Sequence, residues 1–146
     1  MWRRLERLGV ARLGDGLVAL PADARTREQL DWLAEEVVEG GGVATVWLAT
    51  PGSAAQERAV ATAMQDARAA EYWAVTVQAR AAATGTVAER VRAARRLRGE
   101  LRRIARRDFF PPPEREAARV AVQDLTADPA GTDTDQAATE MLEDRR

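Results

Sequence analysis

An arginine-rich segment with a two-sided pattern runs from residue 90 to residue 107. It holds nine arginines and one acid, Glu100, and therefore a net charge of +8. At about 100° per residue, one side of a helix through this segment is apolar and the other is basic. The apolar side consists of Val87, Ala94, Leu97, Leu101, Ile104 and Ala105, and the basic side of Arg92, Arg95, Arg96, Arg98, Arg102, Arg103, Arg106 and Arg107. Prolines 111–113 must end the helix. The pattern predicts an amphipathic helix that docks on a core through one side.

The first twenty residues predict a short helix and a β-hairpin. Apolar residues recur every three positions over residues 2–8, and Gly9 follows at the place of a left-handed helix cap. Two short apolar runs, residues 10–13 and 17–20, flank the sequence Gly-Asp-Gly, which favours the positive φ angles of a tight hairpin.

The middle of the chain predicts a helix, a strand and a second helix. Thr26 and Gln29 have the form of a capping box, and the helix that they open stops at glycines 40–42. Residues 43–49 (VATVWLA) form a β-branched apolar run, which predicts a strand covered on both faces. Residues 53–83 are rich in alanine and favour a long helix.

The aromatic residues are assigned to the core with one exception. Trp2, Trp32 and Trp47 lie on or beside apolar stripes, or inside the predicted buried strand, and are expected to pack in the core. Tyr72 and Trp73 are adjacent on one helix and point in different directions, so one of them should lie nearer the surface.

The last part of the chain predicts one more helix and a tail. Residues 113–125 begin with a proline at a tolerated first-turn position and carry acids near the positive end of the helix dipole. Residues from 126 onward are small, polar and acidic, which is typical of disorder. We therefore expect one domain over residues 1–125 and a disordered acidic tail over residues 126–146.

Composition excludes several classes of function. The chain has no cysteine and no histidine, which removes disulfides, thiol nucleophiles, imidazole bases and nearly every zinc, haem or iron–sulfur site. We expect no enzyme activity, no catalytic residue, no metal site and no cofactor. No apolar run approaches the roughly 18 residues of a membrane span, and the start does not resemble a signal peptide. These observations predict a cytoplasmic protein that does not span a membrane, and among the possible partners we expect no membrane in the end.

Three interpretations of the basic side remain open at this point. It can be the solvated outer face of a docked helix, as arginine-rich compositions produce often. It can bind nucleic acid, because several guanidinium groups can neutralise phosphates and release counterions. It can also lie on an anionic membrane surface, although the apolar side lacks the Trp or Phe that usually anchors such helices.

Several short motifs together resemble the N-terminal domain of the chromate-resistance protein ChrB. The sequence WRRLERLG is followed by Gly-Asp-Gly between two strands, the second of which ends in Leu-Pro, and then by WLAEEV and a glycine turn. Glu71-Tyr72 in the long helix, and the arginine-rich helix running into Arg107-Asp108-Phe109-Phe110 and the prolines, agree in the same order. The resemblance covers about residues 2–125.

The resemblance implies a fold and a function. It implies a cytoplasmic regulator of a chromate-resistance operon that acts on promoter DNA, with the ferredoxin-like fold of PaaX-type repressors. We therefore expect an α+β domain with a small antiparallel sheet covered by helices, to which the arginine-rich helix and a short C-terminal helix are added. Relatives usually have a second, C-terminal domain and an apolar strand before the WRRL helix. We expect the sheet to lack that first strand and the natural protein to begin upstream.

The functional expectation is a transcriptional regulator that binds promoter DNA through the arginine-rich helix. The expected partners are DNA, a second copy of the chain and a separately encoded ChrB C-terminal-domain protein. The alternative is a protein-interaction module that binds an acidic partner, such as that separately encoded domain. The residues expected to contact phosphates are Arg95, Arg96, Arg98, Arg102, Arg103, Arg106 and Arg107.

Overall fold

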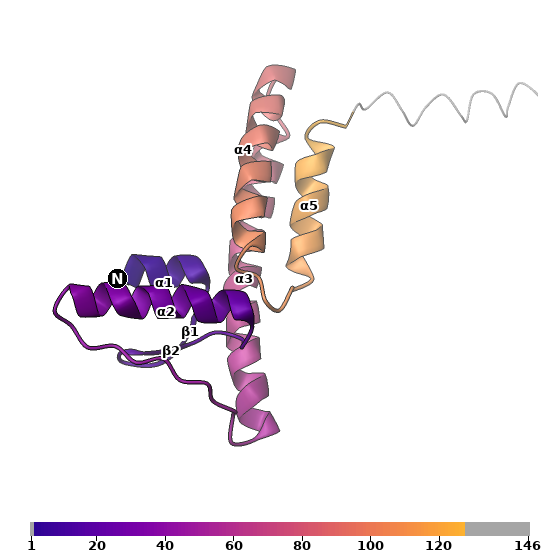
Figure 1. The fold of residues 1–146 in the computed structure, drawn as a ribbon. Coiled ribbons are helices and arrows are strands. Elements are labelled where there is room, and N and C mark those ends of the chain that lie inside the picture. The colour runs from indigo at the N-terminus through magenta and orange to yellow at the C-terminus, as the bar shows by residue number, and fades with distance from the viewer. Residues whose placement is uncertain (1, 128–146) are drawn as a thin grey trace, which may run out of the picture.

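The computed structural model describes residues 2–127 and shows five helices and one β-hairpin (Figure 1). The elements in chain order are α1 (Trp2–Leu8), β1 (Ala11–Gly14), β2 (Leu17–Ala19), α2 (Ala24–Glu39), α3 (Ala54–Ala82), α4 (Val87–Ala105) and α5 (Glu114–Asp124). The predicted α+β class is confirmed, with a small antiparallel sheet and covering helices. Apart from its first two residues, the expected disordered tail lies outside the described residues.

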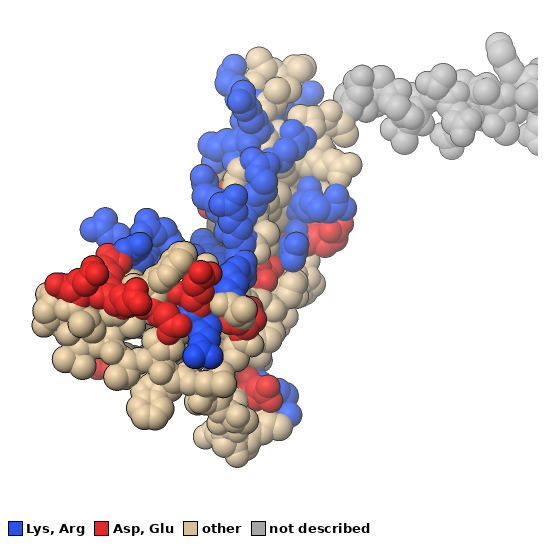
Figure 2. Space-filling model, viewed as in Figure 1, with Lys and Arg blue, Asp and Glu red and all other residues tan. Residues whose placement is uncertain are grey.

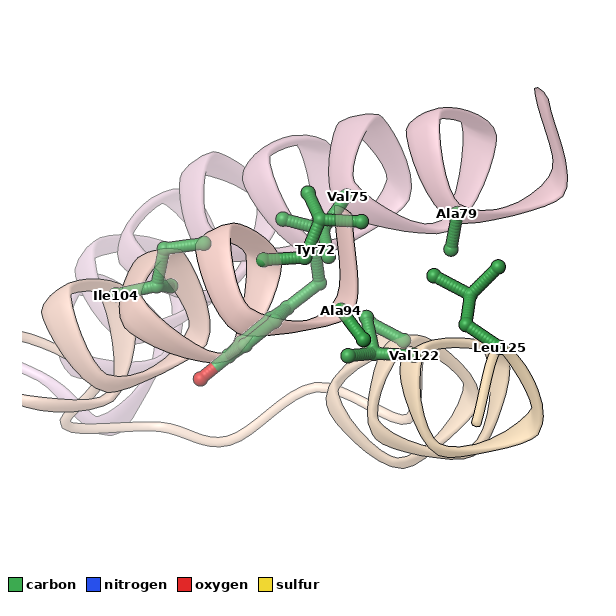
Figure 3. Close-up of a cluster of buried hydrophobic side chains, with 9 residues drawn as sticks. Tyr72, Val75, Ala79, Ala94, Ile104, Val122 and Leu125 are labelled. Carbon is green, nitrogen blue, oxygen red and sulfur yellow. The ribbon is translucent and has the colours of Figure 1, made fainter. Parts of the chain in front are cut away.

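The core is built by three helices, α3, α4 and α5, which stand side by side (Figure 1). Their facing sides bury the nine residues of the cluster in Figure 3: Tyr72, Val75, Ala79, Ala94, Leu97, Ile104, Ala118, Val122 and Leu125. Burial of such side chains is the main favourable contribution to folding. Helices α1 and α2 and the hairpin lie across α3, with β1 in contact with it (Figure 1).

The start of α2 differs from the expectation in one detail. Asp23, and not Thr26, is the N-cap: its Oδ1 accepts from the backbone N–H of Thr26 at 2.8 Å. Thr26 stands at the third helical position, and its Oγ1 accepts from the backbone N–H of Asp23 at 3.1 Å. The bond from the backbone of Thr26 lowers the pKa of Asp23 below its usual value. The capping box is therefore present, shifted by three residues toward the N-terminus.

The predicted strand over residues 43–49 is wrong. The segment has no regular secondary structure, and Val43, Trp47 and Leu48 are 92%, 81% and 82% exposed. A strand needs a partner edge, and within the described residues neither β1 nor β2 pairs with this segment.

The expected burial of the aromatic residues is partly wrong. Trp32 is 63% exposed, and Trp47 lies in the unpaired segment, so neither joins the core. The expectation for the adjacent pair is confirmed, because Tyr72 is buried while Trp73 is exposed. The side chain of Trp2 lies outside what the structure describes.

A candidate nucleic-acid interface

Helix α4 confirms the predicted amphipathic helix, although it runs from Val87 to Ala105 and the arginine-rich segment spans residues 90–107. Thr86 is the N-cap: its backbone N–H donates to Glu89 Oε2 at 2.7 Å, and its Oγ1 accepts from the Glu89 N–H at 3.4 Å. The hydrogen bonds from Thr86 lower the pKa of Glu89. Ala94, Leu97 and Ile104 are buried against α3 and α5. The basic side therefore points away from the core.

The outermost line of α4 is an arginine row, which we define as Arg92, Arg95, Arg102 and Arg106. Together with Gly99 these residues follow a spacing of three, four, three and four, which keeps them on one line of the helix. At 1.5 Å per residue the row is about 21 Å long. Figure 2 shows basic side chains along α4 on one face of the molecule. Within residues 2–127, no hydrogen bond or ion pair engages the guanidinium groups of Arg95, Arg102 or Arg106.

Gly99 leaves an opening in the middle of the arginine row. A Cβ at this position would have Arg102 Nη2, at 3.8 Å, as its only neighbour within 4 Å among the described residues. The helix backbone at Gly99 is therefore partly exposed between Arg95 and Arg102. A ligand that lies along the row can approach the helix more closely here than elsewhere.

Three further arginines of the predicted set are exposed at the sides of the row and contact neighbouring residues. Arg96 donates to Gln78 Oε1 of α3 at 2.8 Å, and Arg98 donates to Thr126 Oγ1, beyond α5, at 2.8 Å. Arg103 forms an ion pair with Glu100 one turn earlier on α4. Exposed contacts of this kind are worth little, so they leave these arginines able to turn toward an anion.

Arg107 lies in a different environment from the other six. Its Nη2 lies 2.6 Å from Glu71 Oε2, while Arg68 holds the other oxygen of the same carboxylate at 2.7 Å. Its Nη1 also donates to the backbone oxygen of Glu6 at 3.4 Å. This arginine therefore joins α1, α3 and the end of α4, and it is partly buried.

The next residue makes a second contact with the same turn of α3. Tyr72 Oη donates to Asp108 Oδ2 at 2.9 Å, and Arg115 Nη1 lies 3.6 Å from the same oxygen. The Asp108 side chain is fully buried, and its Oδ1 has no hydrogen-bond partner among the described residues. Burial and the hydrogen bond to Asp108 raise the pKa of Tyr72 to about 12. Two adjacent residues of α3 thus contact two adjacent residues after α4: Glu71 pairs with Arg107, and Tyr72 pairs with Asp108.

Gly9 permits the end of α1 to pack closely against Arg107. Its φ is +74°, and a Cβ there would lie 2.8 Å from both the Cβ and the backbone oxygen of Arg107. We expect Gly9→Ala to lower the melting temperature by several degrees, because it adds a clash with backbone to the strain of a positive φ. Gly16→Ala is the matched control, since φ is +77° there but nothing lies within 4 Å. Equal losses in the two variants, measured by circular dichroism, would show that close packing at Gly9 contributes nothing.

Sequence reasoning left two groups of basic residues out of the candidate site. Arg92 continues the arginine row by one turn; the sequence places it on the basic side, but it was not among the residues expected to contact phosphates. Helix α1 contributes Arg3, Arg4 and Arg7. Figure 2 shows basic side chains over α1 on the same face as those of α4. No sequence signal places a helix at the start of the chain on the same face as one that begins at Val87.

Comparison with known proteins identifies one family. The family model described as Protein ChrB, N-terminal, matches residues 1–135. No curated protein and no solved structure matches the chain. Within the part of the chain that the structure describes, no helix is both long and apolar enough to cross a bilayer.

Proposed function

We propose that this chain, which belongs to the ChrB N-terminal family, regulates chromate resistance by binding promoter DNA through the outer side of α4. Family membership supplies the context of chromate resistance. The observation that carries the DNA-binding part of the proposal is the arginine row, whose guanidinium groups at Arg95, Arg102 and Arg106 have no partner within the described residues.

The geometry of the row suits a polyanion. A length of about 21 Å corresponds to about six phosphates along one strand, at 3.4 Å of helix axis each. Guanidinium groups bind phosphate oxygens with two parallel N–H bonds and lose less hydration than an ammonium group. The flanking Arg96, Arg98 and Arg103 widen the same surface. Arg107 does not, because it is paired with Glu71 and holds α1, α3 and the end of α4 together. Contacts of this kind position the protein on a duplex, and they do not read its sequence.

The experiment is a triple substitution, Arg95→Gln, Arg102→Gln and Arg106→Gln. We expect weaker binding of a labelled duplex, because three phosphate contacts and their released counterions are lost. The slope of log K against log salt should become shallower by about 0.9 per contact, and so by about 2.7 in total. Fluorescence anisotropy titrations at a series of salt concentrations measure both quantities.

A second triple variant controls for net charge. Arg27, Arg58 and Arg80 are exposed on α2 and α3, and their replacement by glutamine removes the same three charges away from the row. The proposal requires this control to bind almost as the parent does. If the substitution in the row leaves binding unchanged, or if the two triple variants weaken it equally, α4 is not the binding surface.

A further inference from the structure

An uncharged, exposed and unpaired segment links α2 to α3. No charged residue occurs between Glu39 and Glu57. Residues 43–49 within this stretch are apolar apart from Thr45, and Val43, Trp47 and Leu48 are more than 80% exposed. No backbone hydrogen bond to a described residue involves residues 43–52. Exposed apolar side chains and free backbone groups in one segment are typical of a strand that pairs with another strand outside the described chain.

The surroundings of this segment are also unusually apolar. Of the thirteen large hydrophobic residues that are exposed in the described chain, eight lie between residues 13 and 48. They include Leu13 and Leu17 of the hairpin and Trp32 of α2, which are 49%, 57% and 63% exposed. The three-helix core formed by α3, α4 and α5 covers none of them. The N-terminal half therefore presents more apolar surface than its own elements can bury.

We propose that residues 43–49 pair as an antiparallel β-strand with the same residues of a second copy, about a two-fold axis at Val46. In this register Val46 faces its own copy, Thr45 faces Trp47, Ala44 faces Leu48 and Val43 faces Ala49. Cross-strand pairs of aromatic and β-branched residues favour such a ladder. The two-fold pairing closes the interface, as in most homodimers.

The composition of the chain favours a second copy over another segment of the same chain. Strands β1 and β2 pair with each other, and in the described chain neither of their outer edges pairs with residues 43–49. Outside the described part, residues 128–146 hold six acids and two arginines, and their only large apolar residues are Met141 and Leu142. Such a tail does not match an uncharged apolar strand. A second copy brings a strand of equal length with no charge, so no like charges meet. This proposal rests on the exposed segment and is independent of DNA binding.

A single-cysteine experiment tests the register. The chain has no cysteine, so Val46→Cys introduces the only thiol. At the two-fold axis the two Cα atoms would lie about 4.5 to 5.5 Å apart, which is within reach of a disulfide. We expect mild oxidation of this variant to give a cross-linked dimer on a non-reducing gel. Val43→Cys is the matched control, because the proposed register places the two copies of residue 43 about 20 Å apart. Equal cross-linking of the two variants would overturn the register.

The oligomeric state of the unmodified protein in solution tests whether two copies associate at all. Sedimentation should show a monomer–dimer equilibrium as the concentration rises to about 100 μM, which corresponds to a free energy of association of several kcal/mol. Val46→Lys should abolish the dimer by placing two like charges on the axis. Val87→Lys, at a 67% exposed position on α4, should leave the dimer intact. A parent protein that stays monomeric throughout, or a Val46→Lys variant that still dimerises, would refute the proposal.

Discussion

Replacing Leu97 with alanine is expected to lower the free energy of unfolding by about 3 to 4 kcal/mol. Leu97 is fully buried in the cluster that α3, α4 and α5 share, so the substitution leaves a cavity lined by all three helices. Since a domain of this size is stable by about 5 to 15 kcal/mol, the variant should unfold at much lower urea concentration. Chemical denaturation followed by circular dichroism measures the difference.

Val91→Ala on the same helix is the control for this substitution. Val91 is 50% exposed, and we expect its replacement to cost less than about 1 kcal/mol. The comparison separates helix propensity from core packing, because both variants introduce alanine into α4. A loss at Leu97 no larger than that at Val91 would contradict the three-helix core.

We expect a second large loss of stability at alkaline pH, where the hydroxyl of Tyr72 loses its proton. The sequence contains one tyrosine and no lysine, histidine or cysteine, so Tyr72 is the one side chain whose ordinary pKa lies between 9 and 12. The fold raises the pKa of Tyr72 from 10 to about 12. The resulting stabilisation is fully present below pH 10 and is lost as the pH rises through 12. The loss should reach about 2 to 3 kcal/mol, at 1.36 kcal/mol per unit of pKa.

Tyr72→Phe tests the assignment of this pH dependence. Without the hydroxyl, the free energy of unfolding should be nearly constant between pH 9 and pH 12. It should also be lower at neutral pH by about 1.5 to 3 kcal/mol, because the buried Asp108 carboxylate loses its donor. Urea titrations at a series of pH values, with absorbance at 295 nm to follow phenolate formation, give both results. A parent stability that does not change between pH 10 and pH 12 would rule out the raised pKa.

The helices could be predicted from the sequence because their signals are local. For α4, apolar periodicity and the prolines after Asp108 act within a few residues of the helix, and the structure confirms a helix over most of the arginine-rich segment. The strand over residues 43–49 could not be predicted reliably, since a strand forms only against a partner edge. The composition of residues 43–49 indicates that the segment favours a strand, but it does not indicate whether a partner strand is present.

The exposure of most arginines in the candidate site could be predicted from the sequence, but the contacts of Arg107 could not. Helical periodicity placed six of the seven arginines on the exposed side of α4. The seventh, Arg107, is held by Glu71, which lies 36 residues earlier in the chain. The pairing of Glu71-Tyr72 with Arg107-Asp108 depends on how α3 and α4 pack. No pattern in either segment alone reveals it.

The all-arginine composition of the basic face limits how the binding of an anion there could be controlled. Guanidinium groups in general keep their charge near neutral pH, so a surface built of arginine is a poor pH switch. The chain also has no lysine, and acylation of side-chain amines, a common way to neutralise a basic surface, has no target. If the row binds a polyanion as proposed, ionic strength, a competing anion or another molecule that covers the row can release it.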